Sequence, residues 1–115
     1  MRLYKEQERI CRKLGDKAVL QACLGNQGNI HKDRRELDKA MRLYREKERI
    51  CEELGDPKGL AISLVNQSLV LDEKGHPKDA VRLAEEAYQL ASKHGYAALV
   101  RQIKDILDDI RLRMK

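Results

Sequence analysis

The sequence predicts an all-α protein of six helices, arranged as antiparallel hairpins that stack on one another. One observation is that residues 1–40 and 41–80 share 17 of 40 positions without a gap. A period of about 20 to 50 residues is typical of stacked structural repeats. The other is that no segment alternates polar and apolar residues with a period of two, so we expect no strands.

Glycine-containing stops and apolar residues at helical spacing delimit the first three helices. The first is expected over about Arg2–Leu14, ending at Gly15-Asp16. The second runs from about residue 17 to residue 32. The third covers about Leu37–Leu54 and ends at Gly55-Asp56, the same signal 40 residues further on.

The last three helices follow from similar punctuation. The fourth begins at Pro57, which suits the first turn of a helix, and continues to about residue 74 before Gly75. The fifth begins at His76-Pro77 and ends near residue 94, before Gly95. The sixth spans about Ala97–Met114. Connections of two to five residues require antiparallel neighbours.

Composition agrees with a solvated helical protein. Charged residues make up 37% of the chain, and the net charge is +5 from 24 basic and 19 acidic residues. The two signs are interspersed, as in residues 45–49, whereas a nucleic-acid-binding protein more often gathers its basic residues in one patch. The basic excess is therefore only a weak indication of a nucleic-acid partner.

The cysteines and the hydropathy pattern indicate the cellular compartment of the protein. Cys11, Cys23 and Cys51 are odd in number and lack metal-site spacing, so we expect small buried side chains rather than disulfides or a zinc site. No apolar run approaches the roughly 18 residues of a membrane span, and no signal-peptide pattern is present. We expect a reduced, cytoplasmic protein.

No catalytic constellation is found in the sequence. His31, His76 and His94 do not pair with other metal-ligating residues on one face, and Gly25 and Gly28 lie inside a helix rather than in a phosphate-binding loop. We therefore expect neither enzymatic activity nor a metal or cofactor.

The repeat resembles the tetratricopeptide repeat. Leu, a small residue and a bulky residue at spacings of four and three precede a Gly, with Ala five residues further on. In the second copy these and the following small positions are Leu64, Ser68, Leu71, Gly75, Ala80, Ala84 and Ala87. In the first they are Leu24, Gly28, His31 and Ala40, with Tyr44 at the bulky position of the next helix and Arg35 in place of the turn Gly. The 40-residue period is similar to variants in Pins-type adaptors, kinesin light chains and bacterial signalling arrays.

The resemblance implies a short right-handed superhelix, an α-solenoid. In that register the chain is a single domain over residues 1–115. It consists of a lone second-type helix of a truncated repeat (1–15), two hairpins (17–55 and 56–95) and a polar C-terminal capping helix (96–115). The Leu-Gly-Asn-Gln-Gly-Asn segment at residues 24–29 is close to a sequence of the Pins-like subgroup.

The resemblance also implies where a ligand would bind, because the first helix of each hairpin lines a concave groove in this family. The residues that carry over as peptide- or partner-binding positions are Asn26, Asn29, Lys32, Val65, Asn66, Leu69, Asp72, Arg101 and Lys104. An Asn side chain offers a donor and an acceptor to a peptide backbone. Asn26 and Asn66 recur with the period and could instead join adjacent helices, so Asn29, which Leu69 replaces in the second copy, is the better candidate.

Gln27 and Gln67 stand where the family has Leu, and a buried Gln needs hydrogen-bond partners. We expect those partners to be a neighbouring backbone group or the equivalent Gln of the next repeat; the alternative is a Gln that reaches into the groove.

The leading functional prediction is a non-catalytic scaffold that binds a peptide or a neighbouring domain, as part of a larger adaptor or signalling protein. One alternative is a basic helical solenoid that binds nucleic acid. Another is a structural segment that self-associates through the apolar face of its first helix, which carries Leu3 and Ile10. No membrane partner is expected.

Overall fold

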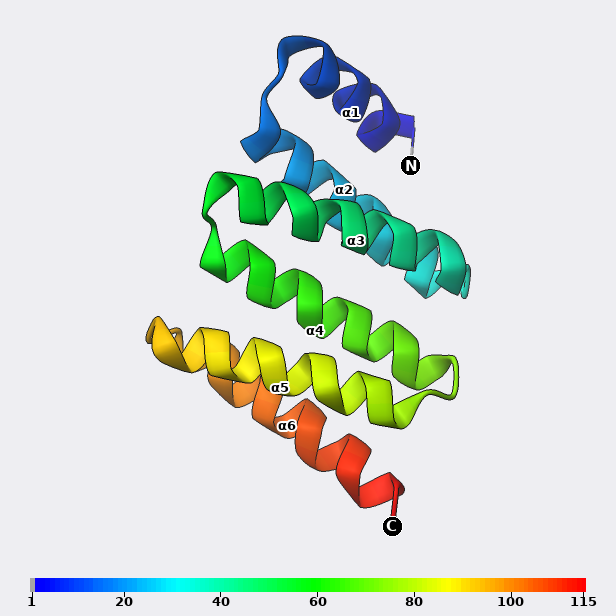
Figure 1. Ribbon diagram of the computed structural model, residues 1–115. Helices are drawn as coiled ribbons and strands as arrows, with labels where there is room; N and C mark the ends of the chain where they lie inside the picture. The colour runs from blue at the N-terminus through cyan, green and yellow to red at the C-terminus, as the bar shows by residue number, and fades with distance from the viewer. Residues whose placement is uncertain (1) are drawn as a thin grey trace. The chain divides into compact units, whose positions relative to one another are not determined.

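The computed structural model describes residues 2–115, which form six helices and no strand (Figure 1). The predicted all-α fold class is confirmed, and every helix begins and ends within one residue of its predicted bounds. The helices are α1 (Arg2–Leu14), α2 (Lys17–Asp33), α3 (Leu37–Leu54), α4 (Pro57–Glu73), α5 (Pro77–Lys93) and α6 (Ala97–Arg113).

The helices divide into two compact units, the first ending at Asp56 and the second beginning at Pro57. In the first unit α2 packs against both α1 and α3; in the second α5 packs against both α4 and α6. Figure 1 shows that consecutive helices within each unit run in opposite directions. The hairpins α2–α3 and α4–α5 are therefore formed, while their union into one solenoid domain stays a prediction.

The turns repeat with half the period of the sequence. A residue with positive φ, between 64° and 86°, ends every turn at 20-residue intervals: Gly15, Arg35, Gly55, Gly75 and Gly95. At Gly55 the amide donates to the Glu52 carbonyl (3.2 Å), and the next amide donates to the Cys51 carbonyl (2.9 Å). The other four turns form the same pair of bonds, which is the Schellman arrangement of a helix end. Arg35 adopts a backbone conformation that glycine adopts at the other four turns.

The core of the first unit is built from small sulfur-containing and aliphatic side chains. The buried cluster comprises Cys11, Leu20, Cys23, Leu24 and Ile50, with Leu43 packed against it. Cys51 is also fully buried, so the prediction that the three cysteines are small buried side chains is confirmed.

Glycines on α2 make room for large side chains on α3. A Cβ atom built on Gly28 would lie 2.6 Å from Cε1 of Tyr44, which is fully buried and donates its hydroxyl to Oδ1 of Asn29. One turn away, a Cβ on Gly25 would lie 2.8 Å from Nζ of Lys47, a lysine that is itself buried. In the first hairpin the large side chains at these positions therefore lie on α3, and the glycines that accommodate them lie on α2.

The second hairpin has small residues on its second helix at the corresponding positions. Ala84 and Ala87 occupy the α5 positions that correspond to the bulky residues of α3, and Val65 joins both in one buried cluster. Ser68 corresponds to Gly28 and is fully buried, where its hydroxyl donates to the Ala80 carbonyl at 2.6 Å. The small residues on α5 therefore let it pack against the larger side chains of α4.

Candidate binding surfaces

The exposed face of α2 carries the predicted amide groups. Asn26 and Asn29 are exposed and Lys32 is half-buried. Residues three apart lie on the same side of a helix, so the two Asn side chains share one face. Tyr44 donates its hydroxyl to Oδ1 of Asn29, which fixes the amide and leaves its nitrogen free to donate elsewhere.

The predicted residues of α4 are more enclosed. Val65 is only 8% exposed and belongs to the core cluster of the second unit. Asn66 and Leu69 are half-buried. Asp72 accepts two hydrogen bonds from the Arg113 guanidinium, at 3.3 and 2.7 Å, and its carboxylate is thereby neutralised within the unit.

The two predicted residues of α6 are both exposed, but only one borders a hollow. Lys104 helps to line a depression of about 280 Å³ between α5 and α6. Across this depression Arg111 forms an ion pair with Glu85 at 2.7 Å. Arg101 does not line it.

Gln27 finds a partner that the sequence did not predict. Its amide nitrogen donates to a carboxylate oxygen of Glu8 on α1 at 2.6 Å, and the side chain is fully buried. Arg12 donates to the other Glu8 oxygen at 2.9 Å. Burial raises the pKa of Glu8, but the hydrogen bonds from Gln27 and Arg12 outweigh burial and lower it below its usual value. Gln67 donates to Ser63 within its own helix at 3.5 Å.

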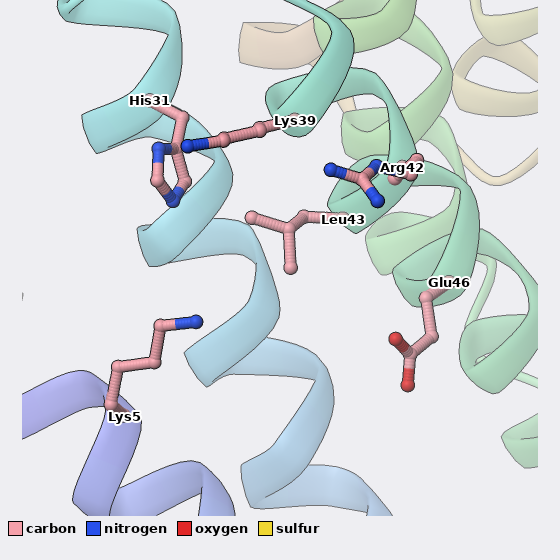
Figure 2. Close-up of a pocket in the computed structure, with 6 residues that line it drawn as sticks. All are labelled: Lys5, His31, Lys39, Arg42, Leu43 and Glu46. Carbon is pink, nitrogen blue, oxygen red and sulfur yellow. The ribbon is translucent and has the colours of Figure 1, made fainter. Parts of the chain in front are cut away.

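A basic hollow of about 520 Å³ lies in the first unit, and the sequence did not predict it. Side chains from three helices line it: Lys5 of α1, His31 of α2, and Lys39, Arg42, Leu43 and Glu46 of α3. Figure 2 shows the cationic ends of Lys5 and Arg42 turned toward the space around Leu43, whereas the ammonium group of Lys39 lies beside the His31 ring.

Ion pairs at its rim hold several of these side chains in place. Glu36 accepts from Nδ1 of His31 at 3.0 Å and pairs with Nζ of Lys39 at 3.3 Å. Glu46 pairs with Arg12 at 2.6 Å. The only signal for this hollow in the sequence was a failure of the repeat, since His31 and Lys39 correspond to Leu71 and Asp79 in the second copy.

No family model matches the chain, and no curated protein matches it either. None of the helices formed by residues 2–115 is long and apolar enough to cross a membrane. Within the same residues, no group of three or more His, Cys, Asp or Glu side chains is placed to hold a metal ion.

Proposed function

We propose that the chain is a non-catalytic scaffold of the tetratricopeptide type, a short right-handed superhelix that binds a peptide segment or a neighbouring domain. Two helix hairpins and five turns with the same pair of hydrogen bonds, at 20-residue intervals, support the repeat architecture. Such arrays present a continuous surface whose shape follows from the repeat, while individual side chains select the ligand.

The observation that carries the binding proposal is the fixed amide of Asn29. Its oxygen is occupied by the Tyr44 hydroxyl, so its two N–H groups are oriented before any ligand arrives. Asn26, exposed one turn earlier on the same face, adds a second amide. An extended peptide has unpaired carbonyl groups along its length, and ordered donors that meet them lose little conformational entropy on binding.

Two substitutions test this surface against a matched control. Peptides selected from a random displayed library against the purified chain serve as probes, with affinity measured by fluorescence anisotropy. Asn29→Asp keeps the acceptor for Tyr44 but removes both donors, and Asn26→Ala removes the other amide. Each should weaken binding about fivefold, the effect of one lost hydrogen bond. Gln7→Ala removes an exposed amide from α1 and should leave binding unchanged.

Circular dichroism must show that both variants remain folded. If the selected peptides bind both variants as tightly as the wild-type chain, the proposed surface is wrong. The proposed surface is also wrong if, on titration with these peptides, the amide chemical shifts that change in NMR spectra of the chain lie outside α2 and α4.

Self-association through α1 is a second candidate because its outer face exposes apolar side chains. Leu3 is 80% exposed, and Ile10 and Leu14 are also exposed. A second copy of α1 could cover them, but α1 carries five basic and two acidic residues, so two such helices repel each other. We therefore expect weak association that strengthens with salt. A monomeric mass by light scattering at about 100 µM protein, in both low and high salt, would exclude it.

A further inference from the structure

We propose that the basic hollow of the first unit is a binding site for a phosphate monoester. It lies on α1, α2 and α3 and does not include the Asn residues of the proposed peptide surface.

The hollow brings several positive charges together. Lys5, Lys39 and Arg42 bring three cationic groups from two helices to one space. Two carboxylates lie near these groups: Glu46 of the lining is paired with Arg12, and Glu36 at the rim is paired with Lys39. Lys5 and Arg42 therefore contribute most of the positive charge of the hollow. A phosphate group has three peripheral oxygens, and the fork of an Arg together with the point charges of Lys is the combination that binds it strongly.

His31 supplies an ordered fourth group. Its side chain is only 12% exposed, and Nδ1 faces the Glu36 carboxylate, so this nitrogen carries a proton and donates. The ring is thereby held in one orientation, and Figure 2 shows it at the edge of the hollow above Lys5. The remaining nitrogen, Nε2, can accept from a protonated phosphate or, when protonated, donate to the dianion.

The repeat architecture does not require these groups. At the corresponding positions of the second copy, Leu71 stands for His31 and Asp79 stands for Lys39. A helix hairpin of the same design therefore forms with an apolar and an acidic residue in their places. Their presence in the first copy is a local departure that creates a basic surface.

Size and lining define the rest of the ligand. A volume of about 520 Å³ lies within the range of about 300–1,000 Å³ that is typical of small-molecule sites. It is larger than a phosphate group alone needs, and Leu43 provides an apolar surface for the carbon atoms of the ester. A phosphorylated side chain of a peptide and a small phosphorylated metabolite share this chemistry.

The test is an NMR titration of the ¹⁵N-labelled chain with four probes. They are inorganic phosphate, glycerol phosphate, a short phosphoserine peptide and the same peptide without phosphate. The phosphate-bearing esters should shift amides around residues 5, 31 and 39–46 at millimolar concentration or below, and the unphosphorylated peptide should not. Tighter binding of the phosphopeptide would identify a phosphoprotein partner, and tighter binding of glycerol phosphate a small metabolite; either result supports the site.

The test variants replace residues of the hollow with those at the corresponding positions of the second copy, because the second hairpin folds with those residues. Lys39→Asp and His31→Leu each should weaken ester binding at least about tenfold, which corresponds to about 1.4 kcal/mol. Lys78→Asp makes the same charge change at an exposed position of α5 and should alter the affinity less than about twofold.

Two results would overturn the proposal. One is the absence of saturable shifts at the hollow with up to about 10 mM of each ester, a limit that corresponds to negligible affinity. The other is an equal loss of affinity in Lys78→Asp and Lys39→Asp, which would show that only the net charge of the chain attracts the anion.

Discussion

Gly28→Ala should destabilise the first unit, although alanine is the better helix former. A methyl group at residue 28 would lie 2.6 Å from Cε1 of Tyr44, whereas ordinary contact begins near 3.4 Å, so the ring must move by about 0.8 Å. Tyr44 is fully buried and donates its hydroxyl to Asn29, so this movement disturbs both its packing and that bond. Overpacking costs about 1–3 kcal/mol, and the higher helix propensity of alanine offsets about 1 kcal/mol. We expect a net loss of about 1 kcal/mol from the free energy of unfolding.

Urea unfolding followed by circular dichroism measures this loss as a lower transition midpoint at an unchanged slope. The matched control introduces Gly28→Ala into a Tyr44→Leu background, where a smaller side chain faces residue 28. There the propensity term should prevail, and alanine should be neutral or stabilising. If Gly28→Ala in the wild-type chain raises stability by about 1 kcal/mol, helix propensity alone decides the outcome and the argument from close packing is refuted.

Three further predictions concern point substitutions. Arg35→Gly should stabilise the chain by about 1 kcal/mol, because Arg35 has a φ of 64° that glycine adopts at less cost. Gly75→Arg, at a φ of 86°, should destabilise the chain by a similar amount. If the two substitutions shift the melting temperature in the same direction, this reasoning is contradicted. Burial lowers the pKa of Lys47 below its ordinary 10.5, so the folded state binds fewer protons than the unfolded state and stability rises with pH toward that value. Lys47→Met should therefore be more stable than the wild type near pH 7, by about 1 kcal/mol, and urea titrations should show the difference shrinking toward about pH 10; a constant difference would refute this reasoning. Ser68→Ala should cost about 1 kcal/mol in chemical denaturation because it removes the donor to the Ala80 carbonyl, and an unchanged midpoint would show that the bond contributes nothing.

The helix boundaries could be predicted closely because their signals are local. Four of the five turns contain a glycine that must adopt positive φ, and each follows a helix with apolar residues at regular spacing. Arg35 carries no such signal by itself. Its place in the turn follows from the period, because it lies 40 residues before Gly75. The repeat period therefore predicts the turn that ends α2, which the residue type at position 35 does not indicate.

The side-chain partners could not be predicted in the same way. Periodicity places Gln27 on an inward face, but the identity of its partner depends on how α1 packs against α2, and that partner is the carboxylate of Glu8. Asn29 was expected to face a ligand, and its bond to Tyr44 exists because Gly28 lets the Tyr ring approach α2. The basic hollow combines residues up to 41 positions apart, from Lys5 to Glu46, none of which forms a motif in the sequence.

The two hairpins differ in how they combine large and small residues at the corresponding positions of their helices. Bulky Tyr44 faces glycine in the first hairpin, and Ala84 occupies the corresponding position of the second, where Ser68 replaces that glycine. Glycine inside a helix costs about 1 kcal/mol relative to alanine, so α2, which contains two, depends more on tertiary packing than α4 does. It follows that residues at facing positions must be exchanged together, and that a graft of one helix from the second hairpin into the first would either overfill the interface or leave a cavity.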